Sequence, residues 1–487
     1  MSVNKIVDVH VKMDKNVGEQ QQDLQLPKIG VRHIQALLIF FYLLVTMLTR
    51  STMSIAVVAM TDNSTSKDSD IVYYKWDNTN IILSSFYWTY IILQPFSGYF
   101  FKHFGLRRCL MATVLLNGVA FTLIPCAAAS FGYMGVIACR MLQGFLQGFT
   151  FPACHASLGL WAPLSERSKL TVLIYSGCNV GVMLAMLITG YISSSPYGWP
   201  LVFYIFGATA IAWCVAWYFL GFDSPAKHPR IGEVEKVYIM ESLEHCEETN
   251  NSNLPIKQIL TSLPFWALAV CNIGNTWGIN LLDLEIPTYI GKVLGFNINE
   301  NGVISALPQI TQLALSLVFA PITDYIVEKK VLSLMNCRRL FQIFGSLVPS
   351  AMLLWLAFID KSQTKLVIVL LNIIVGLTVF LYNASYINHV DISPRYAGLM
   401  LGMENSISQM VGLTGPLFVQ YIVTDMSDIK LWSHVFMVIS VITVITTLFF
   451  MIFGSAKIQW WNSWNSSSTE NVRDPLNPDV NIDENKV

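Results

Sequence analysis

The sequence predicts an all-α membrane protein with twelve transmembrane helices in two six-helix bundles. Of its 487 residues, 54% are hydrophobic, only 13% are charged, and the mean hydropathy is +0.51. A soluble protein carries about 25% charged residues on its wetted surface, so this composition excludes a soluble fold. The 30 Lys and Arg are balanced by 31 Asp and Glu, so no nucleic-acid partner is expected.

Twelve apolar runs are long enough to cross a hydrocarbon core of about 30 Å as helices. They lie at about 33–60, 80–101, 109–130, 132–160, 170–193, 198–222, 263–291, 301–326, 340–359, 366–390, 396–424 and 431–454. The first 32 residues are polar and contain no short apolar core with a cleavage site. The first run is therefore expected to act as the insertion signal.

The distribution of charge predicts how the chain is oriented and divided. Most Lys and Arg outside the runs lie in the terminal segments and in the loops after even-numbered runs, which places these parts in the cytosol. The expected units are a cytosolic segment at 1–32, a bundle at 33–222, a cytosolic linker at 223–262, a bundle at 263–454 and a cytosolic tail at 455–487. Two such bundles are what a secondary transporter needs to alternate access around a central site.

Two arginines, Arg50 and Arg140, fall inside predicted helices, where a charged side chain costs at least about 2.5 kcal/mol. At about 1.5 Å per residue, they lie roughly 15 Å and 12 Å from the outer ends of their helices. Two cations at one level repel unless an anion lies between them, and guanidinium binds carboxylate or phosphate in a bidentate manner. We therefore expect an anion site; the alternative is that each arginine pairs with an internal carboxylate, such as Asp283 or Glu285.

The helix that contains Arg140 carries further polar and small side chains. Gln143 and Gln147 fall on roughly the same helical face as Arg140, and Gly144 and Gly148 have the spacing of a GxxxG packing motif. Amides can donate hydrogen bonds into a polar cavity, so Gln147 is a candidate for shaping the substrate site. Hydrogen bonding between helices is the alternative role.

Three acidic residues within predicted helices, Asp283, Glu285 and Glu404, are candidates for coupling, by binding sodium or by carrying a proton. Such a role is expected because an anion needs a cation to drive it into a negative interior. Partnering the arginines is the alternative. Asp324, near a cytosolic helix end, is expected to act in gating.

Several stretches together resemble the anion:cation symporters of the major facilitator superfamily, solute carrier family 17. These stretches are RSTMSIAVVAM from Arg50, SSFYWTYIILQPFSGY from Ser84, RMLQGFLQGFTFPACHASLGLWAPLSERSKL from Arg140, SPAKHP at 224–229 and NHVDISPRYAGLMLGMEN from Asn388. The family includes sodium-dependent phosphate cotransporters, vesicular glutamate transporters and sialin, and the resemblance covers about residues 35–455. It implies the major facilitator fold, with Arg50 and Arg140 at the positions of substrate-binding arginines.

Departures from the family pattern narrow the expected activity. Gln147 stands where the glutamate and sialic-acid branches place a glutamate, and Leu83 and Asn275 stand where the glutamate branch has a histidine and an arginine. A neutral Gln147 cannot carry a proton, which favours the sodium-phosphate branch. Lys102 replaces the superfamily's acidic residue after the second helix, whereas Asp324 keeps the equivalent in the second half.

The expected function is secondary transport of inorganic phosphate or a small organic anion by sodium-coupled symport. The alternative within transport is a proton-coupled or facilitated carboxylate carrier of vesicular or lysosomal type, and a channel or sensor on the same scaffold is a more distant one. An enzyme is not expected, because the chain has neither HExxH nor GxxxxGK[ST] and its histidines do not cluster. His155 and His389 are expected to serve in packing rather than as proton relays.

No cofactor is expected beyond sodium as the coupling ion, and the expected partners are a small anion and the lipid bilayer. The nine cysteines are scattered without a CxxC pair, so no disulfide framework is expected. The sequon at Asn63 lies in the first exoplasmic loop and is expected to be glycosylated. Neither terminal segment carries a clear acidic dileucine signal, which favours the plasma membrane over a vesicular or lysosomal membrane.

Overall fold

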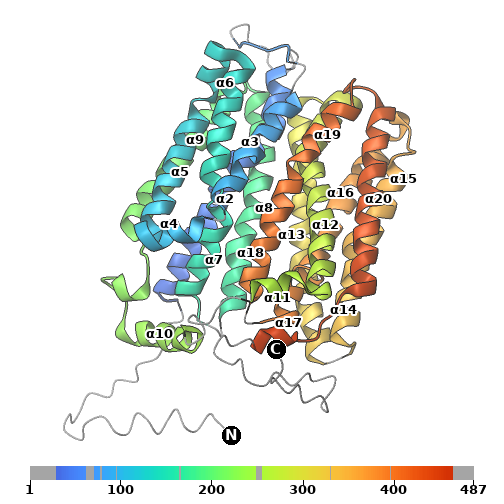
Figure 1. Cartoon of the computed structure of the whole chain (residues 1–487). Helices are drawn as coiled ribbons and strands as arrows, with labels where there is room; N and C mark the ends of the chain where they lie inside the picture. Colours follow the sequence, from blue (N-terminus) through green and yellow to red (C-terminus); the bar gives the residue numbers. More distant parts are fainter. Residues whose placement is uncertain are drawn as a thin grey trace, which may run out of the picture.

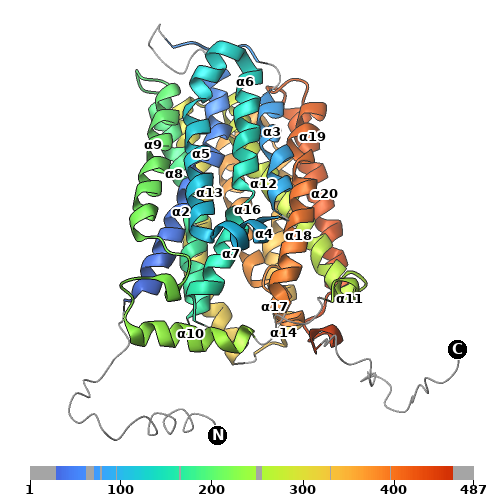
Figure 2. The ribbon, with the colours of Figure 1, turned by 60° about the vertical axis from the view of Figure 1, so that its left-hand side comes forward.

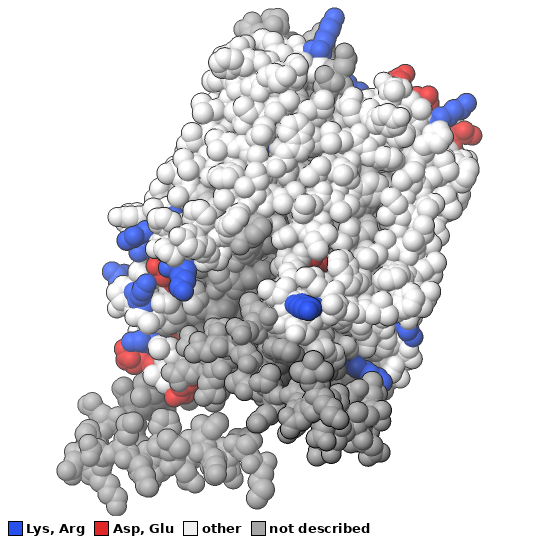
Figure 3. Space-filling view, viewed as in Figure 1, with Lys and Arg blue, Asp and Glu red and all other residues white. Residues whose placement is uncertain are grey.

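The structure is a computed structural model that describes residues 29–61, 71–76, 79–94, 96–163, 166–247, 255–329, 331–394 and 396–463. These residues form helices and short helical turns and no strand, which confirms the predicted all-α class. Most of the long helices stand side by side as an upright bundle (Figure 1). A broad band of uncharged side chains covers the visible face of this bundle, and charged side chains gather near its ends (Figure 3).

The first half of the chain contains the helices that carry Arg50 and Arg140. They are α2 (Val31–Thr61), α3 (Thr79–Leu93), α4 (Ser97–Phe104), α5 (Leu106–Thr122), α6 (Ile124–Gln147), α7 (Thr150–Trp161), α8 (Arg167–Ser193) and α9 (Pro200–Leu220). The segment that follows contains η2 (Pro225–Lys227), α10 (Glu233–Glu247) and α11 (Ile256–Leu260).

The second half has the same kind of helices, interrupted more often by short turns of other helical types. Its elements are α12 (Leu263–Tyr289), η3 (Ile290–Leu294), α13 (Ile298–Glu328), α14 (Leu334–Gln342), η4 (Ile343–Leu347), α15 (Val348–Leu356), η5 (Lys361–Gln363), α16 (Thr364–Leu377), η6 (Thr378–Asn383), α17 (Asn388–Ile392), α18 (Ala397–Gly412), α19 (Thr414–Ile422), α20 (Ile429–Phe453) and η7 (Trp460–Ser463).

Each of the twelve predicted runs coincides with a helix or with consecutive helices of the described chain. Eight helical stretches are long and apolar enough to cross a membrane, and the pair α4 and α5, bent by 115°, is a possible ninth. The other runs coincide with α3, which has only 15 residues, with α12, and with α18 and α19. Helix α12 carries the candidate coupling acids Asp283 and Glu285, and α18 carries Glu404.

Two glycines form tight turns between predicted spans. Gly105 joins α4 to α5 with φ 81°, and Gly132 interrupts α6 with φ 60° and ψ −145°. Positive φ values are readily adopted only by glycine, so these residues permit the chain to reverse. The break at Gly132 falls at the start of the run predicted at 132–160.

The two halves pack closely at one end of the bundle, where α8 ends and α13 begins. A Cβ atom placed on Gly190 of α8 would lie 2.7 Å from the Cα atom of Gly302 of α13, so only glycine permits this approach. Nearby, Ile298 and Ala306 of α13 belong to the same buried apolar cluster as Met186 of α8. This end of the contact between the halves is therefore sealed by apolar packing.

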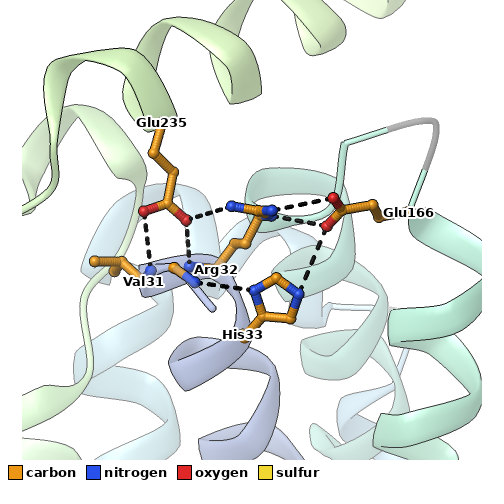
Figure 4. Close-up of polar contacts among 6 residues, drawn as sticks. Val31, Arg32, His33, Glu166 and Glu235 are labelled. Atoms are coloured by element: carbon orange, nitrogen blue, oxygen red, sulfur yellow. Dashed lines mark hydrogen bonds and ion pairs between the residues drawn. The ribbon is translucent and has the colours of Figure 1, made fainter. Parts of the chain in front are cut away.

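At the other end, α10 lies across the base of the bundle (Figure 2) and is fastened to α2 by a buried arginine. Arg32 Nη1 donates to Glu235 Oε1 at 2.9 Å, and Arg32 Nε donates to Glu166 Oε2 at 2.7 Å (Figure 4). Glu235 Oε2 also accepts a hydrogen bond from the backbone N–H of Val31 at 3.0 Å. The linker helix is thus held against the first half of the chain.

Hydrogen bonding to Arg32 lowers the pKa of Glu166 below its usual value of 4.5. This carboxylate therefore contributes its full stabilisation above about pH 4.5, and the contribution is lost as the pH falls through the lower folded-state pKa.

Glu235→Ala should destabilise the protein by about 3 kcal/mol, because it removes one partner of a buried charge. The measurement is the thermal melting of the purified protein at neutral pH. Glu233→Ala is the matched control, because Glu233 lies in the same helix with its side chain 81% exposed. Equal melting temperatures for the two variants would contradict the fastening role of Glu235.

Candidate functional site: two arginines on one aromatic ring

The structure brings Arg50 of α2 and Arg140 of α6 to the same side chain, Phe86 of α3. The Cζ atom of Arg50 is 5.1 Å from the centroid of the Phe86 ring, and that of Arg140 is 4.8 Å away. A cation within about 6 Å of an aromatic ring is attracted by its π electrons. The charges of the two arginines also act on each other. Phe86 therefore holds two like charges near one point.

Neither arginine has a carboxylate partner within salt-bridge distance among the described residues. Arg50 Nη2 donates to the hydroxyl of Tyr87 at 3.1 Å, and Arg140 Nη1 donates to Gln143 Oε1 at 3.2 Å. Arg140 is only 1% exposed, and its Nε is buried without a hydrogen-bond partner. A buried, unneutralised guanidinium with a free donor is what an anion site requires.

Arg50 differs from Arg140 in being half-buried rather than buried. Its Cζ atom lies 5.2 Å from the ring centroid of Tyr87 and 5.3 Å from that of Tyr90, so aromatic side chains enclose it together with Phe86. Arg50 retains accessible surface at the middle of α2 while Arg140 is enclosed. An anion entering this region would therefore meet Arg50 before Arg140.

The GxxxG glycines of α6 bring this helix against α3 and so place Phe86 between the arginines. A Cβ atom on Gly144 would lie 1.9 Å from the carbonyl oxygen of Phe86, and one on Gly148 would lie 2.6 Å from that of Tyr90. The hydroxyl of Thr89 strengthens the contact by donating to the carbonyl oxygen of Met141 at 2.5 Å. Thr89 thus bonds α3 to α6.

Gln147, expected to shape the substrate site, lies in a buried hydrogen-bond network beside it. Its Nε2 donates to Thr49 Oγ1 at 3.2 Å and to Asn117 Oδ1 at 3.1 Å, and Asn117 Nδ2 donates to Thr49 Oγ1 at 3.1 Å. These three residues tie α6, α2 and α5 together. Because Thr49 precedes Arg50, the network fixes the part of α2 that carries this arginine.

Asp283 and Glu285 lie in different surroundings although they are two residues apart. Asp283 is half-buried, accepts a hydrogen bond from Gln309 Nε2 at 3.3 Å, and is close enough to Arg50 for their charges to interact. Glu285 is 3% exposed, and both its carboxyl oxygens are buried without hydrogen-bond partners. It lines a cavity of about 10 Å³ between α12 and α20, together with Tyr289, Trp432 and apolar residues. The structure therefore brings Asp283, but not Glu285, toward the arginines.

Glu404 of α18 pairs with His389 of α17. His389 Nε2 and Glu404 Oε2 are 2.5 Å apart, and both side chains are buried. His389 Nδ1 lies 3.1 Å from the carbonyl oxygen of Tyr386, to which only a protonated Nδ1 can donate. His389 thus does more than fill space, because it forms a close polar contact with a buried carboxyl group.

The remaining predicted site residues do not join the arginines. Asp324 lies in α13, but its side chain is outside the described part of the structure, and Asn63 lies outside the described residues. His155 Nε2 contacts the hydroxyl of Tyr175 at 3.0 Å in an exposed position.

The sequence analysis missed the aromatic residues of the site, although it quoted the stretch that contains them. Phe86, Tyr87 and Tyr90 follow the spacing i, i+1 and i+4, which places Phe86 and Tyr90 on one face of a helix. Aromatic residues at this spacing beside two unpaired arginines are a signal for cation–π contacts. What the sequence does not contain is the rotation of α3 that aims this face at the arginines.

Comparisons with known proteins agree with the fold. Residues 38–412 match the model of the Major Facilitator Superfamily. Among solved structures, the chain is similar to the xylose transporter from E. coli in its inward-open conformation, with a TM-score of 0.64, 15% identity, and coverage of 87% of this chain and 96% of that one. This similarity supports the fold alone.

Curated relatives narrow the class further. The chain is 32% identical to human sialin over 89% of its own length and 91% of the relative's. It is 32% identical to a Drosophila ananassae protein named "Putative inorganic phosphate cotransporter" over 85% and 90% of the two chains, and 31% identical to zebrafish (Danio rerio) vesicular glutamate transporter 3 over 91% and 76%. The chain therefore belongs to the major facilitator superfamily and, within it, to solute carrier family 17. It is a multi-pass membrane protein and an anion transporter of this family's type rather than an enzyme.

Gly144→Ala should lower both thermal stability and anion uptake, because the added methyl group meets the α3 backbone at Phe86 and displaces the ring between the arginines. Gly159→Ala is the control, because a Cβ atom there has no neighbour within 4 Å. The control should melt at the wild-type temperature or slightly above it, since alanine favours a helix over glycine by about 1 kcal/mol. Wild-type uptake by Gly144→Ala would show that this helix contact does not position the site.

Proposed function

We propose that the protein transports inorganic phosphate or a small organic anion across the membrane by sodium-coupled symport with alternating access. The observation that carries the proposal is the pair Arg50 and Arg140, which share Phe86 and have no carboxylate partner among the described residues. An anion between two guanidiniums relieves their mutual repulsion and satisfies free donors such as Arg140 Nε. Tetrahedral phosphate presents oxygens to both guanidiniums at once, which makes it the first substrate to test.

Gln147 has a supporting role in this mechanism, because it holds Thr49 and hence the neighbouring Arg50 in place. If sodium is the coupling ion, Asp283 is the preferred candidate for binding it. Its carboxylate is half-buried, and carboxylate oxygens are hard ligands suited to a hard cation. A cation bound at Asp283 would add positive charge near Arg50 and so strengthen anion binding, which is the linkage that symport requires.

Glu285 and Glu404 remain candidates for coupling, in surroundings that differ from those of Asp283. Among the described residues that line its small cavity, Glu285 is the one carboxylate, and a single carboxylate in mostly apolar surroundings suits a proton better than a metal ion. Asp324 is assigned to gating at the cytosolic end of α13.

We place the protein in the plasma membrane, with its termini in the cytosol and a glycan on Asn63.

A second candidate function is proton-coupled or facilitated transport of a carboxylate, and the contact between His389 and Glu404 favours it. His389 Nδ1 donates to the carbonyl oxygen of Tyr386, so only Nε2 is available to face Glu404. In this candidate function one proton lies between Nε2 and Oε2, either on the imidazolium or on the carboxylic acid. A buried pair that holds one such proton can act as a proton carrier when it is opened to water.

Uptake of radiolabelled phosphate into cells that express the chain, with and without external sodium, tests the first candidate. We expect sodium-dependent uptake that Arg140→Gln reduces at least a hundredfold, because loss of a buried charge-assisted contact costs about 3 kcal/mol or more. Arg230→Gln, an exposed arginine of the linker, is the control and should transport normally at equal surface expression. Unchanged phosphate uptake in Arg140→Gln would contradict the anion-binding role of this arginine.

The same assay separates the second candidate from the first. If protons drive transport, an inward proton gradient should stimulate uptake of phosphate or carboxylates without sodium, and Glu404→Gln and His389→Gln should both abolish this stimulation. Sodium-dependent uptake that is indifferent to the proton gradient and survives in Glu404→Gln would exclude the second candidate.

A further inference from the structure

A cavity of about 500 Å³ lies away from the two arginines, at the turn between α4 and α5. The last turn of α4, the start of α5, one side of α7 and the first residues after α9 line it. Its charged walls carry Lys102, His103, Arg108 and Lys227, all of which are exposed. Figure 3 shows basic side chains gathered at this level of the molecule, at the edge of the uncharged band. The cavity is therefore rich in positive charge and open to ligands.

The one acidic residue that lines this cavity is already engaged. Asp223 Oδ1 accepts a hydrogen bond from the backbone N–H of Arg107 at 2.7 Å, and the same carboxylate lies against Gly105. It thus stabilises the start of α5 instead of pairing with the lysines. None of the basic side chains of the cavity forms an ion pair in the part of the chain that the structure describes. Their charge is available to an anionic ligand.

The cavity also has apolar walls that continue onto the lipid-facing surface. Phe104 and Leu160 line it and are 55% and 38% exposed. At the adjoining end of α9, Tyr218 and Phe219 are 56% and 67% exposed. Exposed aromatic and aliphatic side chains on a membrane helix face acyl chains, and aromatic residues are favoured at the level of the headgroups. A ligand in this cavity would therefore meet positive charge and hydrocarbon-facing surface together.

We propose that this cavity binds the phosphate-bearing headgroup of an anionic lipid in the leaflet that faces the termini. The phosphate would lie among Lys102, Arg108 and Lys227, and the acyl chains would run along Phe104 and Leu160. A soluble phosphate ester would find the same cations but would gain nothing from the apolar walls. Lys and Arg beside membrane helices attract anionic lipids, and each such residue near the membrane surface contributes about 1 kcal/mol.

Binding to the purified full-length protein in detergent tests the proposal. The probes are short-chain phosphatidylserine and phosphatidylinositol phosphate, with short-chain phosphatidylcholine as the zwitterionic reference. We expect the anionic lipids to bind at least tenfold more tightly than phosphatidylcholine. The double variant Lys102→Gln with Arg108→Gln should lose this preference. The control is Lys361→Gln with Lys430→Gln, two exposed lysines outside the cavity whose removal changes the net charge equally.

Equal binding of anionic and zwitterionic lipids, or an unchanged preference in the Lys102 and Arg108 double variant, would overturn the proposal. Inositol phosphate without acyl chains is the second arm. If it binds as tightly as the lipid, the apolar walls contribute nothing and the lipid assignment is wrong. The proposal is independent of the transported substrate, because lipid binding is measured without a gradient and the Arg140→Gln variant should retain it.

Discussion

Positive charge that no carboxylate neutralises is the constraint on which the proposed site depends. Arg50 and Arg140 lie deep in the helical bundle, yet their contacts are an aromatic ring, a tyrosine hydroxyl and an amide oxygen. Cation–π contacts each contribute about 0.5–2 kcal/mol, which does not offset the cost of burying a charge. The fold therefore holds the two cations in place by packing, and in the proposed function an anion completes the site.

The surrounding helices supply that packing through close contacts at small residues. Gly144 and Gly148 bring α6 against the backbone of α3, and Gln147 and Asn117 hold Thr49 beside Arg50. The close approach of Gly190 and Gly302 seals one end of the contact between the halves. Alternating access requires contacts of this kind, because each of its states must close the central site on one side.

The sequence was sufficient to predict the helices, because length and hydropathy determine them. It also distinguishes Asp283 from Glu285, because residues two positions apart lie about 200° apart around a helix and must face different neighbours. The shared ring of Phe86 could not be predicted, since it depends on how α3 rotates against Gly144. The pairing of His389 with Glu404 likewise depends on how the chain turns between α17 and α18.

The most direct test of the central claim is to locate a bound anion. Arsenate has the charge and shape of phosphate, and its arsenic atom gives an anomalous X-ray signal in crystals of the protein. We predict an anomalous peak between the guanidinium groups of Arg50 and Arg140 that is absent from crystals of Arg140→Gln. A peak elsewhere in the wild-type protein, or one that persists at this position in Arg140→Gln, would contradict the account.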